Sequence, residues 1–168
     1  MATDTMTPGR RRFLAGLGGL SAWTGNGIAA PAAPGEPVHW PSVELLDGTR
    51  WGPAQARGLA VVVVFWSTTC PFCLRHNARL NRLVARAPAG LAILTAARET
   101  DAERVRRHAE RHGYRFAITL EAQPLAAALS GRRMIPLTVT VDRMGRLAQV
   151  IPGEMSEDDI LGLARWAG

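Results

Sequence analysis

The chain has 168 residues, of which 47% are hydrophobic and 20% are charged, so it is long enough to fold as one domain with a core and too apolar to be disordered. All of its basic residues are arginine, and the formal net charge is +6. Three of these arginines are Arg10–Arg12, and the rest of the chain has no basic patch interleaved with aromatic residues, so we exclude nucleic acid as a partner.

The N-terminal region, residues 1–33, is predicted to be an export signal with its cleavage region. Arg10-Arg11-Arg12-Phe13-Leu14 resembles the twin-arginine export motif, and a weakly apolar stretch at 14–23 follows it. At about ten residues, this stretch is too short to span a bilayer but suits the apolar region of a signal peptide. The alternative is a basic tail. We expect residues 34–168 to form the domain in the bacterial periplasm, an oxidising compartment.

Extended structure is predicted at the start of this domain. The proline-rich segment 31–41 is predicted to be an extended leader, and residues 43–46 with the turn Asp47-Gly48-Thr49 predict a short hairpin. Residues 59–66 are apolar without alternation, which is typical of a strand buried on both faces. We therefore place this last segment at the centre of the sheet.

The only two cysteines, Cys70 and Cys73, follow that strand directly. Pro71 suits the first position of a helix, which we predict over residues 71–87. Cys70 would then lie at the helix N-terminus, where free N–H groups and the helix dipole favour a thiolate, the attacking species in disulfide exchange. Cys73, one turn on and more buried, would resolve the mixed disulfide. A structural disulfide with this spacing would constrain the unfolded chain little, so we predict a redox-active pair.

The remaining elements alternate between helix and strand. Arginines at 75, 79, 82 and 86 share one face of the first helix, which we expect to be solvated. Residues 91–97 predict a second buried strand, and Thr100 with Glu103 predicts a capping box for a helix that ends at Gly113. Further predicted elements are a strand at 116–119, a helix at 124–129, an antiparallel hairpin of strands 137–141 and 146–151, and a last helix capped by Ser156 and Asp159.

Two motifs together resemble a known family. Phe65-Trp66 stands four residues ahead of Cys70-Pro71-Phe72-Cys73, and Ile135-Pro136-Leu137-Thr138 opens a later strand. This combination resembles the thioredoxin fold and, within it, the TlpA/ResA/CcmG-like periplasmic thiol–disulfide oxidoreductases, over residues 36–168. The resemblance implies an α/β three-layer sandwich, with a central mixed sheet flanked by helices and with the extra strand and helix of TlpA-like proteins.

The resemblance also assigns roles to site residues. It implies that Pro136 is a cis-proline facing the dithiol, rather than an ordinary trans turn proline, and that Ile135 offers backbone hydrogen bonds to a bound substrate. The residues expected to support the catalytic pair Cys70 and Cys73 are Pro136, Ile135, Pro71, Phe72, Trp66 and His76. No cofactor is implied. We also expect no metal, because His108 and His112 share a predicted helix face without a third ligand nearby.

Three positions depart from better-known relatives. Val64 replaces a buried Asp of thioredoxin, Thr69 replaces a Trp before the first cysteine, and His76 replaces a Glu common in ResA-like reductases. No carboxylate for proton transfer is therefore identified. Two interpretations of His76 remain open: it donates to the thiolate or shuttles protons, since its ordinary pKa lies near neutrality, or it is a partly buried imidazole bonded to backbone.

The function that the resemblance implies is reduction of disulfides in exported client proteins, apocytochrome c or a copper-site protein being examples. A membrane electron donor would supply the electrons, and we expect a monomer. One alternative is a dithiol oxidase or isomerase. Another is a copper chaperone that binds Cu(I) through Cys70, Cys73 and a histidine, although copper chaperones of this fold usually space their cysteines by three residues.

Overall fold

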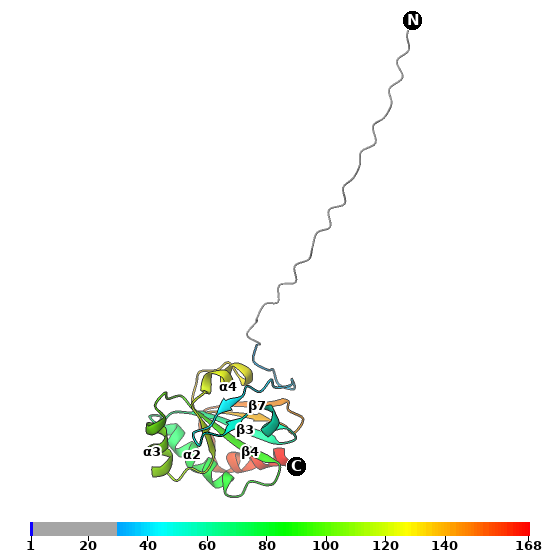
Figure 1. Cartoon of the computed structure of the whole chain (residues 1–168). Helices are drawn as coiled ribbons and strands as arrows, with labels where there is room; N and C mark the ends of the chain where they lie inside the picture. Colours follow the sequence, from blue (N-terminus) through cyan, green and yellow to red (C-terminus); the bar gives the residue numbers. More distant parts are fainter. Residues whose placement is uncertain (2–29) are drawn as a thin grey trace.

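The computed structural model describes residue 1 and residues 30–168, so the predicted twin-arginine motif and the apolar stretch after it lie outside the described residues (Figure 1). The described domain is built on a five-stranded sheet with the order β5-β4-β3-β6-β7. Its strands are β3 (Ala60–Trp66), β4 (Leu91–Ala97), β5 (Ala117–Thr119), β6 (Leu137–Val141) and β7 (Leu147–Pro152). A separate antiparallel pair, β1 (Val43–Glu44) and β2 (Arg50–Trp51), confirms the predicted short hairpin.

Strand β3 is the central strand, as its unbroken apolar sequence predicts. It pairs in parallel with β4 and antiparallel with β6, and all seven of its residues are buried. Strand β5 extends the parallel half, while β7 pairs antiparallel with β6. The sheet is therefore mixed, and the carboxyl ends of β3, β4 and β5 lie along the same edge.

Helices cover both faces of the sheet (Figure 1). They are α1 (Pro53–Ala56), α2 (Pro71–Val84), α3 (Ala102–Arg111), α4 (Ala122–Leu129) and α5 (Glu157–Leu161), which continues into a 3-10 helix (Gly162–Ala167). Helix α4 covers one face, and α2, α3 and α5 cover the other. Within the described part of the chain, no helix is long and apolar enough to cross a bilayer.

Alternation along β3 divides the core into two clusters. Val61, Val63 and Phe65 pack with α4, whereas Val62, Val64 and Trp66 pack with α2 and the C-terminal helices. Successive side chains of a strand point to opposite faces, so a single β-branched run supplies both cores. This is the three-layer thioredoxin-like architecture that we expected.

Three predicted helix ends differ from the structure, and one of them is the start of α4, which begins at Ala122, two residues earlier than predicted. The cap of α3 is Asp101, whose side chain accepts the Arg104 N–H at 3.1 Å, so the capping box of Thr100 and Glu103 is wrong by one residue. Helix α2 ends at Val84, three residues earlier than predicted, and its last turn tightens through a hydrogen bond from Arg86 N–H to the Leu83 carbonyl. The predicted cap of α5 is confirmed, because Ser156 Oγ accepts the Asp159 N–H.

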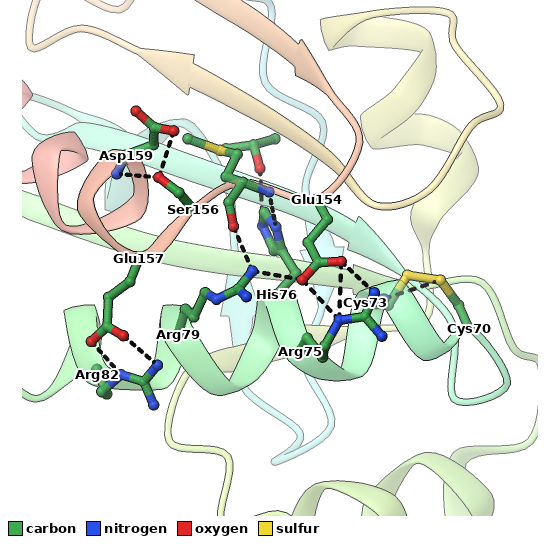
Figure 2. A network of polar contacts seen from close by, with 12 residues as sticks. Cys70, Cys73, Arg75, His76, Arg79, Arg82, Glu154, Ser156, Glu157 and Asp159 are labelled. Carbon is green, nitrogen blue, oxygen red and sulfur yellow. Dashed lines mark hydrogen bonds and ion pairs between the residues drawn. A yellow bond between two sulfur atoms is a disulfide. The ribbon is translucent and has the colours of Figure 1, made fainter.

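The arginine face of α2 is not simply solvated, as we had expected it to be. Arg75 and Arg79 both contact Glu154, each with a closest N–O distance of 2.6 Å, and Arg82 forms an ion pair with Glu157 at 2.7 Å (Figure 2). These carboxylates belong to the segment that connects β7 to α5 and to α5 itself. The arginine face therefore joins α2 to the C-terminal part of the domain.

Candidate active site

The two cysteines form a disulfide at the N-terminus of α2, with their Cα atoms 5.2 Å apart. Cys70 is the N-cap of the helix, and Pro71 is its first residue. The Cys70 sulfur accepts the backbone N–H of Cys73 at 3.1 Å. The predicted position of Cys70 is confirmed, and a negative charge on its sulfur would be stabilised by that N–H and by the helix dipole.

The two sulfurs differ in their access to solvent. Cys70 is half-buried, whereas Cys73 is fully buried in the core cluster on the α2 face of the sheet. Phe72, between them in sequence, is 55% exposed and carries the Arg75 guanidinium 5.0 Å from its ring centre. An incoming disulfide therefore has access to Cys70 first, beside an exposed aromatic ring.

Trp66 supports the loop that leads to Cys70. It is the last residue of β3, is fully buried, and packs edge-on against Tyr114, with ring centres 5.7 Å apart. Its carbonyl accepts the Arg98 N–H at 3.0 Å. Trp66 thus connects the dithiol loop to the core and to the end of β4.

The segment before β6 lies beside the end of β3. The Ile135–Pro136 peptide bond is cis. Leu137 pairs with Phe65 across the antiparallel ladder, so Pro136 is at the level of Trp66. Ile135 is half-buried and packs against both core clusters. Pro136 and Ile135 therefore lie beside the loop that carries Cys70.

His76 is fully buried one turn after Cys73, and both of its ring nitrogens have partners within the fold (Figure 2). Nδ1 accepts the Met155 N–H at 3.2 Å, and Nε2 lies 3.1 Å from Thr138 Oγ1. A backbone N–H only donates, so Nδ1 carries no proton and the neutral ring donates from Nε2 to Thr138. This is the arrangement of a buried imidazole bonded to backbone, the second of the two interpretations of this residue.

Burial also keeps this imidazole neutral. Desolvation is the main reason that the pKa of His76 falls to about 4. The negative charge of Glu154 raises this pKa in part, and the positive charge of Arg79 lowers it. Both backbone polar groups of Met155 are hydrogen-bonded to α2, because its carbonyl accepts from Arg79 at 2.7 Å and its N–H donates to His76. His76 therefore links α2 to the β7–α5 segment and to β6.

Glu99, which follows β4, has a role near the dithiol that sequence reasoning missed. Its Oε1 accepts hydrogen bonds from Ser67 Oγ at 2.7 Å, the Thr68 N–H at 2.6 Å and Thr68 Oγ1 at 2.8 Å. Burial raises the pKa of Glu99, but these hydrogen bonds outweigh it and leave the pKa below its ordinary value. A carboxylate is therefore ionised beneath the loop that leads to Cys70, although Val64 and His76 occupy the positions where relatives carry carboxylates.

Its neighbour, Arg98, holds the segment before Pro136. The guanidinium donates to the carbonyl oxygens of Arg132, Arg133 and Met134. From the end of β4, Glu99 thus holds the loop that leads to Cys70, and Arg98 holds the segment before Pro136. Only one signal in the sequence pointed to them: both residues come directly after a predicted buried strand, at the edge where parallel strands end.

The predicted histidine pair does not gain a third ligand. His108 and His112 have ring centres 4.5 Å apart. In the described part of the chain, no group of three or more His, Cys, Asp or Glu side chains lies close enough together to hold a metal ion. The chemistry that the described site supports is that of the sulfur pair.

Comparison with known proteins places this site in a family. No family model matches the chain. Two curated relatives, thiol–disulfide oxidoreductases ResA of Geobacillus kaustophilus and Geobacillus thermodenitrificans, are 30% and 29% identical over 116 residues, which cover 68% of this chain and 67% of each relative.

Solved structures agree with the fold. A thiol:disulfide interchange protein of the thioredoxin family from Chlorobium tepidum superposes with a TM-score of 0.72 at 24% identity, covering 82% of this chain and 99% of the other. StoA from Bacillus subtilis gives a TM-score of 0.65 at 16% identity, covering 80% and 100%. With its cysteine pair at disulfide distance on a thioredoxin-like sheet, the chain belongs to the family of ResA-like thiol–disulfide oxidoreductases.

Proposed function

We propose that this protein reduces disulfides of exported client proteins in the periplasm, and that a dithiol donor at the membrane returns it to the reduced state. The relatives named thiol–disulfide oxidoreductase ResA support the reaction type. Apocytochrome c and copper-site proteins are the client classes we favour. We propose that the protein acts as a monomer and needs no cofactor, since both electrons are carried by the sulfur pair.

The observation that carries the proposal is the different environment of the two sulfurs. The half-buried Cys70 thiolate attacks a client disulfide, the client S–S bond breaks, and one client thiolate leaves. The buried Cys73 thiolate then attacks Cys70, which forms the intramolecular disulfide and releases the second client thiolate. Two electrons pass to the client, and two protons from solvent complete its dithiol.

The Glu99 carboxylate supports the reducing direction. Thr68, which donates to it, is two residues before Cys70, so the negative charge lies within roughly 10 Å of the sulfur. A negative charge there destabilises the Cys70 thiolate and therefore the reduced form. The Arg104 guanidinium, which donates to Thr68 Oγ1 at 3.0 Å, offsets part of this effect. A destabilised reduced form gives its electrons away more readily.

Glu99→Gln is expected to lower the pKa of the Cys70 thiol by about 0.5 to 1. The substitution removes about 1 kcal/mol of repulsion between the carboxylate and the thiolate, and it keeps the shape and acceptor oxygen of the side chain. The reduction potential is expected to rise by up to about 20 mV. Thiolate absorbance across a pH series gives the pKa. Glu110→Gln removes an exposed carboxylate of α3 and serves as the control. Equal Cys70 pKa values in the two variants would contradict the assigned role of Glu99.

The reduction potential of the Cys70–Cys73 couple tests the proposed direction. We expect a value near that of thioredoxin, about −270 mV, and a value near that of DsbA, about −120 mV, would instead favour the dithiol oxidase. A parallel Cu(I) titration tests the chaperone alternative. Both ring nitrogens of His76 are occupied by Thr138 and Met155, so we expect weak copper binding, and tight stoichiometric binding would overturn the proposal.

A further inference from the structure

The surface on the cis-proline side of the dithiol is both apolar and basic. Phe72 is 55% exposed and Met134 is 46% exposed, and Arg132 and Arg133 beside Met134 are exposed as well. We call these four residues the docking surface. Phe72 lies between the two cysteines, and Met134 is two residues before Pro136. The docking surface thus borders Cys70, the half-buried cysteine of the pair.

The basic side chains of this surface lack acidic partners. In the described part of the chain, neither Arg132 nor Arg133 forms an ion pair. Arg98 adds a third guanidinium beneath them, and its donors are occupied by backbone carbonyls rather than by a carboxylate. Burial lowers the pKa of Arg98, and the charge of Arg133 lowers it further, so like charges are close together here.

The acidic groups nearby do not form ion pairs with these arginines. Glu99 accepts hydrogen bonds from Ser67 and Thr68, and Asp101 caps α3. Glu154 is occupied by Arg75 and Arg79. The positive charge of Arg132 and Arg133 therefore faces solvent at the place where a client must approach.

We infer that the docking surface selects client segments that carry carboxylates close to the disulfide cysteine. The inference rests on the proposed exchange reaction and adds a substrate class to it. An apolar client side chain would cover Phe72 and Met134, while client carboxylates would reach Arg132 and Arg133. Charge complementarity of this kind raises the rate of encounter more than it stabilises the complex, so it appears in the second-order rate constant.

The test compares three peptides of equal length, each closed by one intramolecular disulfide and carrying two Glu, two Gln or two Lys residues within four positions of each cysteine. The reduced full-length protein is mixed with each peptide, and the rate constant is divided by that of dithiothreitol with the same peptide. We expect the Glu peptide to react about tenfold faster than the Lys peptide at low ionic strength, and the difference to shrink in high salt.

A charge-reversed variant locates the effect. Arg132→Glu with Arg133→Glu is expected to reverse the order of the peptides. The matched control, Arg57→Glu with Arg86→Glu, changes net charge equally at two exposed arginines, and Arg86 lies beyond the other end of α2. Equal normalised rates for the three peptides, or equal effects of the two double variants, would overturn the inference while leaving the exchange function intact. Failure of all three peptides to react would overturn the proposed function and the inference together.

Discussion

Replacing Cys73 with serine is expected to trap client proteins on Cys70 as stable mixed disulfides, whereas replacing Cys70 with serine is expected to reduce the exchange rate by about a thousandfold or more. The reason is the burial of the second sulfur. Cys73 is fully buried and is bonded to Cys70 across one turn of α2, so we expect it to resolve the mixed disulfide rather than to attack a client. Non-reducing gels and mass spectrometry of the purified protein mixed with a disulfide peptide give the fraction trapped.

The two single variants serve as controls for each other, because each keeps one thiol and the same helix. In the Cys70→Ser variant, the introduced hydroxyl oxygen replaces the sulfur as acceptor for the Cys73 N–H at the N-cap, so α2 should stay capped. The double variant sets the background of the assay. If Cys70→Ser trapped as much peptide as Cys73→Ser, the roles of the two cysteines would be reversed or shared, and the proposed order of attack would be wrong.

The sequence alone predicts those elements of the fold that depend on residues close together in the chain. The run from Val61 to Val64 is apolar on both sides of the strand, and only the centre of a sheet buries both sides. Pro71 fits the first turn of a helix because its missing N–H would have no partner there, so it determined the start of α2 and the position of Cys70. Both signals lie within a few residues of the feature they predict.

The sequence was not sufficient where a partner comes from a distant segment. Helical spacing showed that Arg75, Arg79 and Arg82 share a face, but not that Glu154 and Glu157 would cover it. An ion pair across 75 to 79 residues depends on how α5 returns to α2, which no local pattern encodes. The same holds for Glu99, which resembles any acidic loop residue until the parallel pairing of β3 and β4 brings it beneath Ser67 and Thr68.

His76 shows how a tertiary contact decides between two interpretations. Its position one turn after Cys73 fitted either a proton shuttle or a structural imidazole. Thr138 and Met155, which are 62 and 79 residues away, occupy its two nitrogens, so the ring bridges three elements of the fold. Its chemistry follows from that burial, and it makes stability, rather than the exchange reaction, the property that His76 should control.

Acidification is expected to destabilise the oxidised protein between pH 6.5 and about 4 through His76. The pKa of this residue falls to about 4 in the folded state, because burial disfavours the charged ring, while the unfolded chain keeps a value near 6.5. In this interval the unfolded state binds a proton that the folded state does not, so the free energy of unfolding falls as the pH falls. A tenfold difference in proton affinity is worth about 1.4 kcal/mol, so the loss is about 3 kcal/mol and is nearly complete by about pH 4.

Urea unfolding at a series of pH values measures this loss, with His76→Gln as the informative variant and His39→Gln, at an exposed histidine, as the control. The quantity compared is the slope of the free energy of unfolding against pH, which is independent of any constant cost of the substitution.

Other titrating groups contribute in a different pH range or equally in every variant. The pKa values of Glu99 and Glu154 are also lowered in the folded state, but a carboxyl group of this kind reduces stability only as the pH falls to its ordinary pKa near 4.5 and below. His108, whose pKa burial also lowers, is present in every variant. His76→Gln should therefore flatten the slope between pH 6.5 and 5, where the carboxyl groups contribute little. Parallel curves for the wild-type chain and His76→Gln would mean that His76 takes up a proton in the folded state, and would return it to consideration as a proton carrier for the dithiol.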